Sequence, residues 1–310
     1  MKKLNIKWDN SIKDTTGYLF SFAKSLGTAV KNSPYLDYAE DIIATSGFAF
    51  RMWVADKDLC PSATSIWDFD SQKAWVENGG LCCNYVGRYW GQDDIEEERR
   101  NNAINIIKKS IDDGIPAISW DISMPEWGLI TGYDDTSRMF STLSISGSTD
   151  DMSYDILGKR EIPILSVLTI TGKTDKPKNK ILKDTLNLAI GHLKGQEWCD
   201  NSKGLDAYPA LIKFFKDSFQ PDLSWNMEYY LGTYGALKYH AYRYFEENDL
   251  MELSNLYKEV YENWKTAFEI KTCNDISNKQ LREQIVFELN HACDNERKAV
   301  DIMKNVVSKL

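Results

Sequence analysis

The chain has 310 residues, of which 43% are hydrophobic, 27% charged and 12% aromatic, a composition that excludes disordered, collagen-like and coiled-coil proteins. At this length we expect two domains or one large one, because a single core rarely grows much beyond roughly 250 residues. The 37 Lys and Arg against 46 Asp and Glu give a net charge of −9. Since phosphate neutralisation supplies most nucleic-acid affinity, this acidic surplus argues against a nucleic-acid partner.

Targeting signals are not recognisable in the sequence. Lys2, Lys3 and Lys7 give the N-terminus the charges of a signal peptide, but the apolar run that should follow is missing. No apolar segment approaches the roughly 20 residues needed to cross a bilayer. We therefore expect a cytoplasmic protein without a membrane partner, and the sequence leaves open whether it forms a homo-oligomer.

The cysteines predict reduced thiols rather than a disulfide framework, as is usual for a large cytosolic chain. Their spacing contains no Cys-x-x-Cys pair, and Cys82 and Cys83 are adjacent, which is poor geometry for two ligands on one metal. We expect neither a metal nor a cofactor. The six are Cys60, Cys82, Cys83, Cys199, Cys273 and Cys293.

In the first half of the chain, the sequence pattern predicts helices first and strands after them. Residues 16–30 carry apolar side chains at helical spacing, with Thr15 and Thr16 as possible caps. Residues 35–46 repeat the pattern more weakly, residues 47–55 suit a strand or a buried turn, and residues 56–91 are aromatic-rich and irregular.

The clearest helix of this half covers residues 93–113, because acidic residues crowd its start and Lys108 and Lys109 lie near its end. Strand-like runs follow at residues 117–122, 127–133, 138–145 and 162–171. Residues 134–137 (Asp-Asp-Thr-Ser) have hairpin-turn chemistry between two of them. Helix followed by neighbouring strands indicates an α+β domain with a central antiparallel sheet.

The second half is predicted to be all helical. Residues 172–179 are polar and contain a proline, which makes them the best linker. Leu253, Tyr257, Val260 and Trp264 then recur at helical spacing, and apolar residues continue the pattern to the C-terminus. We therefore divide the chain into an α+β domain at residues 1–172 and a helical domain at residues 173–310.

A family resemblance rests on Gly114-Ile115-Pro116 and, one strand later, on residues 125–134 (Pro-Glu-Trp-Gly-Leu-Ile-Thr-Gly-Tyr-Asp). These residues resemble the strand pair of papain-like cysteine peptidases of the bacteriocin-processing type and of the related butirosin-biosynthesis acyltransferase family (H type). Residues 204–208 (Gly-Leu-Asp-Ala-Tyr) are similar to a motif in the helical second part of the latter. The resemblance implies a papain-like first domain followed by a helical one.

The chain departs from this family at both reactive positions. In active members a cysteine opens the first helix and a histidine begins the strand that ends in Gly-Tyr-Asp. Here the cysteine position falls on or beside Thr16, and the histidine position on Glu126 or Trp127. The three histidines, His192, His240 and His291, all lie in the helical half. Loss of both groups argues against inherited thiol chemistry.

Three functions remain open. The first is a catalytically inactive or non-classical family member that binds a small molecule or a peptide in an interdomain cleft. The predicted ligand contacts are Tyr18, Trp120, Trp127 and Tyr208. Burial in the core explains the two tryptophans equally well. The second is an acyltransferase or amide hydrolase with a displaced nucleophile, either Cys60 or Thr16, with Glu126 as base for the latter. The third is a scaffold or interaction protein whose cleft is filled.

Overall fold

The computed structural model describes residues 1–8 and 12–310. The chain folds into two compact units, and each is described by itself. The first contains Met1–Ile12, Ser21–Ile42 and Asp68–Lys176, and the second contains Lys13–Phe20, Ile43–Trp67 and Pro177–Leu310. The main break thus falls close to the predicted linker, but two segments of the first half belong to the second unit.

The described part of the first unit contains a seven-stranded sheet in which every paired strand is antiparallel. Six strands follow one another across the sheet, and the short β1 (Lys2–Lys3) pairs with β5. The order is β3 (Leu81–Arg88), β8 (Leu165–Lys173), β4 (Ala117–Ser119), β5 (Gly128–Asp134), β6 (Met139–Leu143) and β7 (Asp151–Ser153). The central antiparallel sheet expected from the sequence is confirmed.

Strand β3 was not predicted, since its residues fall in the stretch assigned as irregular. Its sequence, Leu-Cys-Cys-Asn-Tyr-Val-Gly-Arg, contains an asparagine and a glycine, which have low strand propensity. The strand forms because it pairs with β8 along its whole length, from Leu81 opposite Lys173 to Arg88 opposite Leu165. A long-range partner therefore decides its conformation.

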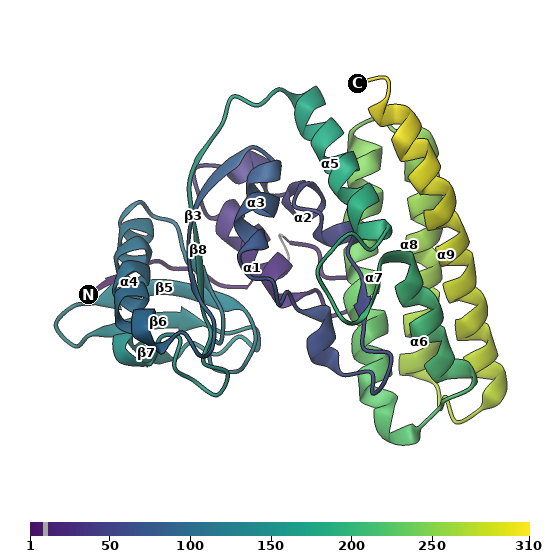
Figure 1. Cartoon of the computed structure of the whole chain (residues 1–310), viewed down its shortest axis with the longest axis horizontal. Coiled ribbons are helices and arrows are strands. Elements are labelled where there is room, and N and C mark those ends of the chain that lie inside the picture. Colours follow the sequence, from purple (N-terminus) through teal and green to yellow (C-terminus); the bar gives the residue numbers. More distant parts are fainter. Residues whose placement is uncertain (9–11) are drawn as a thin grey trace. The chain divides into compact units, whose positions relative to one another are not determined.

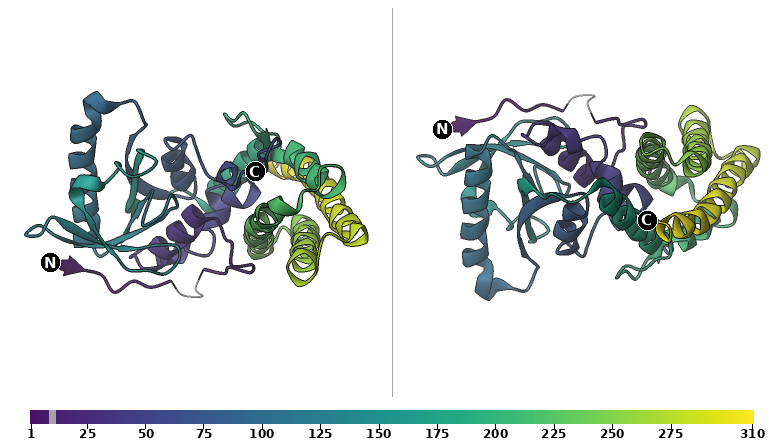
Figure 2. Two further views of the ribbon diagram at one scale, coloured as in Figure 1. Left: turned by 90° about the horizontal axis from the view of Figure 1, so that it is seen from below. Right: turned by 90° about the horizontal axis from the view of Figure 1, so that it is seen from above.

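Helices cover both faces of this sheet, as Figure 2 shows. The helix α4 (Glu96–Asp112) packs against β3, β5 and β8, and α1 (Ser21–Lys31) packs against β4 and β5 from the other side. Strand residues alternate between the two faces. Ile130 joins the core beneath α4, and its neighbour Leu129, also buried, points to the face of α1.

The start of α1 differs from the prediction. The helix was expected from residue 16, but it begins at Ser21, and Thr16 lies in an irregular turn before it. Gly17 has φ = +83°, a left-handed conformation incompatible with a helix, and the Asp14 carboxylate accepts hydrogen bonds from the Gly17 and Leu19 amides. Local turn chemistry therefore delays the helix to Ser21.

The second unit is mainly helical, as expected (Figure 1). Helix α7 packs against α8, which packs against α9, while α5 and α6 also contact α9. Leu253, Tyr257, Val260 and Trp264 are all buried, so the predicted core-facing stripe of α8 is confirmed. The five helices are α5 (Lys178–Leu193), α6 (Ala207–Lys216), α7 (Ser224–Glu247), α8 (Met251–Cys273) and α9 (Lys279–Val307).

Residues 47–55, predicted as a strand or a buried turn, contain both. A short turn of helix (Phe48–Phe50) leads into β2 (Trp53–Val54), which pairs with β9 (Ser202–Lys203) in the second unit. The remaining helices of the first half are α2 (Ile42–Thr45) and α3 (Ser71–Asn78). None of the helices in residues 1–8 and 12–310 combines the length and the apolar character that a membrane span requires.

Candidate functional site

A serine and a glutamate meet at the N-terminus of α1, within the first unit. Ser21 is the first residue of α1, and Glu126 lies two residues before β5. The Ser21 hydroxyl donates a hydrogen bond to Glu126 Oε2 at 2.5 Å and accepts one from the Trp127 amide at 3.3 Å. The Ser21 side chain is thus held on both sides by the same two-residue segment.

The loop that carries Glu126 is strained and contains a second carboxylate. Asp121 and Ser123 have φ = +60° and +66°, a conformation that costs non-glycine residues of order 1–3 kcal/mol. The Arg160 guanidinium holds the loop, since it pairs with Asp121 Oδ1 at 3.3 Å and donates to the Ser123 carbonyl at 3.0 Å. Backbone strain of this kind is concentrated at functional sites.

Asp121 is the most unusual residue of this loop. Its side chain is buried, and Oδ2 has no hydrogen-bond partner among the described residues. Burial raises the pKa of Asp121 above its ordinary value, against the opposing effect of Arg160. A buried carboxylate with an unpaired oxygen can accept a hydrogen bond from a ligand.

Trp120 and Trp127, two of the predicted ligand contacts, are both buried. The Trp127 ring lies 4.8 Å from that of Phe22, 5.4 Å from that of Phe69 and 5.3 Å from that of Trp120. The four rings pack against one another beside the Ser21–Glu126 pair and form part of the core of the first unit. That either tryptophan touches a ligand stays a prediction.

Thr16, a predicted nucleophile, belongs to the second unit. Its hydroxyl donates to the Gly232 carbonyl at 2.8 Å and accepts from the Tyr18 amide at 3.2 Å. These are the contacts of a turn residue, and a carbonyl oxygen cannot take the hydroxyl proton as a base would. The first helix begins at Ser21, so the prediction that Thr16 opens it was wrong, and Thr16 as a nucleophile stays a prediction.

Tyr18, another predicted ligand contact, is fixed by charged neighbours in the second unit. Its hydroxyl donates to Glu228 Oε1 at 2.7 Å, and Lys271 donates to Glu228 Oε2 at 3.0 Å. Burial and the Glu228 carboxylate raise the pKa of Tyr18 to about 12. Its ring also packs edge-on against those of Tyr229 and Phe268. Tyr18 as a ligand contact remains a prediction.

Cys60, the predicted displaced thiol, begins a short turn in the second unit. Its sulfur lies 3.0 Å from the Ser62 hydroxyl, its amide donates to Asp58, and its carbonyl accepts from Tyr230. The described contacts of Cys60 include neither an imidazole nor a carboxylate next to the sulfur. These contacts are those of a structural turn, and catalysis by Cys60 stays an untested alternative.

The three histidines are also occupied by neighbours in the second unit. His240 Nε2 bonds to the Lys13 carbonyl at 2.9 Å, and the His291 ring lies 4.2 Å from that of Phe287. His192 Nδ1 bonds to Glu197, whose carboxylate also accepts from Arg51 Nε at 2.8 Å. In the described part of the chain, the contacts bring none of these imidazoles to a thiol.

The Arg51–Glu197–His192 cluster is buried and was missed by sequence reasoning. Arg51 also donates to the Thr64 and Ser65 carbonyls at 3.1 and 3.0 Å. Burial raises the pKa of Glu197, but Arg51 and His192 outweigh it and hold the pKa at about 2. Glu197 therefore stays ionised at neutral pH, and the cluster ties residues 51–65 to the end of α5.

Tyr208, the fourth predicted ligand contact, is fully buried in the helical unit. Its hydroxyl donates to Glu296 Oε2 at 2.9 Å and accepts from Trp264 Nε1 at 2.9 Å. Glu296 also pairs with Lys238 at 2.7 Å, and both charged side chains have zero exposure. One edge of Tyr208 nevertheless lines a cavity between α6 and α9.

Ser21 was overlooked because the sequence pattern placed the helix start too early. Gly17 and the turn-forming Asp14 signal a boundary downstream of Thr16, and Ser21 is the first residue after them with a helix-capping side chain. The signal was present but weaker than the apolar periodicity, which extends into the irregular turn.

No family model matches the sequence, and a search of the curated proteins found no match. Across residues 1–8 and 12–310, no three His, Cys, Asp or Glu side chains gather so as to hold a metal ion. The functional groups of the site are the Ser21 hydroxyl, the Glu126 and Asp121 carboxyl groups and the Arg160 guanidinium.

Proposed function

We propose that this chain is a papain-like family member that has lost thiolate chemistry and that binds a small molecule or a peptide. The observation that carries the proposal is the Ser21–Glu126 hydrogen bond of 2.5 Å. The resemblance calls for a nucleophile at the start of the first helix and a base just before the strand that ends in Gly-Tyr-Asp. Ser21 opens α1 and Glu126 precedes β5, and their side chains touch.

The two side chains are unsuited to the family's reaction. The family's reaction uses a thiolate and an imidazolium, whereas the pair here consists of a hydroxyl and a carboxyl group. The Trp127 amide donates a further hydrogen bond to the Ser21 oxygen. The pair therefore acts as a structural lock between the start of α1 and the loop before β5.

Ligand binding is supported by the loop from Trp120 to Glu126. A structural lock needs neither two left-handed non-glycine residues nor a buried carboxylate with an unpaired oxygen, since both lower stability. Asp121 Oδ2 can accept a hydrogen bond from a ligand, and an anion beside aromatic rings suits an amine with an apolar body. We therefore infer a cationic or amphipathic ligand.

Loss of catalysis is tested with a fluorophosphonate probe, which labels activated serines. We expect intact-mass and peptide analysis to find no adduct on Ser21 in the native protein at neutral pH. An adduct on Ser21 that is absent after heat denaturation would overturn the inactive assignment.

A double variant tests whether Ser21 and Glu126 occupy the positions of the cysteine and the histidine in papain-like enzymes. In Ser21→Cys/Glu126→His the new thiol should meet an imidazole, which lowers the thiol pKa and speeds alkylation by iodoacetamide in mild acid. The matched control is Ser21→Cys alone, where the glutamate raises the thiol pKa instead. Equal alkylation rates in the two variants would contradict the placement of Ser21 and Glu126 at the family's reactive positions.

Ligand binding is tested with phenethylamine, an amine with an apolar body, by saturation-transfer NMR. We expect binding to the native protein and its loss in Asp121→Asn, which removes the charge at constant size. Binding that persists unchanged in Asp121→Asn, or no binding to the native protein, would refute Asp121 as the ligand contact.

The second candidate is a hydrolase or acyltransferase in which Ser21, rather than Thr16 or Cys60, is the displaced nucleophile. Its specific support is the short Ser21–Glu126 bond, which gives the hydroxyl a carboxylate acceptor for its proton. In that case the fluorophosphonate adduct forms on Ser21 and disappears in Glu126→Gln. An adduct that persists in Glu126→Gln would exclude Glu126 as the base.

A further inference from the structure

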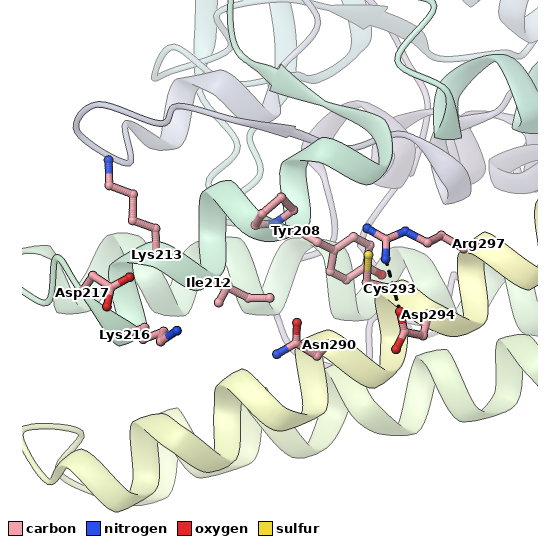
Figure 3. A pocket seen from close by; sticks show the side chains of 10 residues that line it. Tyr208, Ile212, Lys213, Lys216, Asp217, Asn290, Cys293, Asp294 and Arg297 are labelled. Carbon is pink, nitrogen blue, oxygen red and sulfur yellow. Dashed lines mark hydrogen bonds and ion pairs between the residues drawn. The ribbon is translucent and has the colours of Figure 1, made fainter.

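The second unit contains a cavity of about 220 Å³ between α6 and α9 (Figure 3). Its walls include Tyr208, Ile212 and Lys216 from α6, and Asn290, Cys293 and Arg297 from α9. The volume is below the 300–1,000 Å³ of sites for drug-sized ligands. The cavity therefore suits a small organic molecule.

One wall of the cavity is held rigidly by the buried network behind it. The Tyr208 hydroxyl donates to Glu296 and accepts from Trp264 Nε1, each at 2.9 Å, and Glu296 is fixed in turn by Lys238. The Tyr208 ring therefore has little freedom to move into the cavity. A rigid wall reduces the entropy lost when a ligand binds.

The lining of the cavity includes a thiol that is uncharged at neutral pH. Cys293 is almost fully buried, and burial raises the pKa of its thiol to about 11, so it is neutral and unreactive. In Figure 3 the Cys293 sulfur lies next to the Tyr208 ring, and Ile212 lies further along the cavity. The Tyr208 ring and the Cys293 sulfur therefore offer an apolar contact at one end of a lining that is otherwise mixed.

A cation borders the cavity next to Tyr208 and Cys293. Arg297 pairs with Asp294 of the same helix at 3.3 Å, and both side chains are more than half exposed, so the pair is weak and can exchange for a ligand. Lys216, which is exposed, lies at the other end of the cavity (Figure 3). An anion that enters at the Arg297 end would therefore meet a guanidinium without displacing a buried partner.

Asp294 lies at the Arg297 end of the cavity, and Asp217 lies at the other end (Figure 3). Their carboxylates repel a dianion such as a phosphate monoester more strongly than a monoanion. A carboxylate can accept two parallel hydrogen bonds from the Arg297 guanidinium while it carries only one negative charge.

We propose that the cavity between α6 and α9 binds a small monocarboxylic acid with an apolar body. Arg297 holds the carboxylate, and Tyr208 and Cys293 contact the apolar part. This site lies wholly within the second unit and does not rest on the function proposed for the first.

The test uses phenylbutyrate, with phenylbutanol and phenylbutyl phosphate as matched probes, in titrations of the full chain followed by NMR. We expect phenylbutyrate to bind with a dissociation constant of roughly millimolar or below, and both other probes to bind about tenfold more weakly or not at all. Equal or tighter binding of the alcohol or the phosphate would overturn the assignment, as would no binding of phenylbutyrate.

Two variants localise the site. Arg297→Gln should weaken phenylbutyrate binding by about tenfold, because a charge-assisted hydrogen bond is lost. The control Arg243→Gln alters an exposed arginine of α7 that pairs with Glu246 and Glu247 and should have no effect. Unchanged binding in Arg297→Gln, or an equal loss in both variants, would refute the proposal. Because Arg297 is exposed, the variant should fold normally.

Discussion

The two units bury their polar groups in different ways. In the first unit Ser21 and Glu126 share one hydrogen bond at a helix end, and the glutamate side chain is only partly buried. In the second unit Lys238 and Glu296 have zero exposure, and Tyr208 and Trp264 extend their network. Both members of the Lys238–Glu296 ion pair are therefore removed from solvent, whereas Glu126 remains partly exposed to it.

This difference shows that a buried charge is not by itself a site of chemistry. Tyr208, Lys238, Trp264 and Glu296 come from α6, α7, α8 and α9 in turn, so their network fixes the register of four helices. Desolvation makes such a pair costly, and breaking it is costlier still. The Ser21–Glu126 pair joins a neutral hydroxyl to a partly buried side chain, so its desolvation penalty is smaller. Variants in the second unit should therefore change the free energy of unfolding more than variants in the first.

The largest effect is expected for Glu296→Gln. The change leaves the Lys238 ammonium buried without its counter-charge, which should lower the free energy of unfolding by about 3–5 kcal/mol. Urea unfolding followed by circular dichroism of the helices measures it. The double variant Lys238→Met/Glu296→Leu should recover most of the loss. A loss below about 1 kcal/mol in the single variant would show that the pair does not stabilise the helical unit.

A second effect concerns His240, whose environment in the second unit is also buried. Burial lowers its pKa to about 4 from 6.5, outweighing the opposite influence of the Lys13 carbonyl and Asp14. Below pH 6.5 the unfolded chain binds a proton that the folded chain does not. Stability should therefore fall as the pH drops from about 6.5 to about 4, by roughly 2–3 kcal/mol.

Urea unfolding across this pH range measures the effect, with His240→Gln as control. Glutamine can still donate to the Lys13 carbonyl but does not titrate, so its stability should depend less on pH by that amount. Parallel pH profiles for the two proteins would contradict the buried, neutral state of His240. The loss from Glu197, whose pKa is about 2, begins only at lower pH, since its unfolded value is about 4.5.

A smaller effect is expected for Ser21→Ala in the first unit. Glu126 loses one hydrogen bond but is exposed enough to regain water, so the cost should be about 1–2 kcal/mol. Ser25→Ala on the same helix is the matched control, because the Ser25 hydroxyl is buried without a hydrogen-bond partner among the described residues. That change should be neutral or stabilising. Equal losses in both variants would show that the Ser21–Glu126 bond contributes nothing.

The smallest effect, and one of opposite sign, is expected for Asp121→Asn. The raised pKa shows that burial disfavours the charged carboxylate, and asparagine tolerates φ = +60° well. Unfolding at neutral pH should show a gain of up to about 1 kcal/mol, or no change if the lost Arg160 pair offsets it. A clear loss of stability would mean that Asp121 serves the fold rather than a ligand.

The fold could be predicted from the sequence in those segments where the local sequence pattern is strong. The helix at residues 93–113 was expected close to where α4 lies, because charges at both ends match the helix dipole. The strand that ends in Gly132-Tyr133-Asp134 and the turn after it were also expected. Strand β3 was missed, because pairing with β8 rather than local propensity makes it a strand.

The candidate site could be read only in part. Glu126 was named because it precedes a recognisable strand, but its partner was taken as Thr16. Ser21 and Glu126 are 105 positions apart, and nothing local in the sequence links them. The strain at Asp121 and Ser123 was invisible as well, since no residue type requires it.

The sequence by itself determined the charge balance, the linker and the helical second half. These properties depend on composition and on short-range periodicity. The tertiary structure alone decided that Ser21 meets Glu126, that Lys238 meets Glu296, and that α6 and α9 leave a cavity. Such contacts join residues far apart in the chain, so they exist only once the core has brought the elements together.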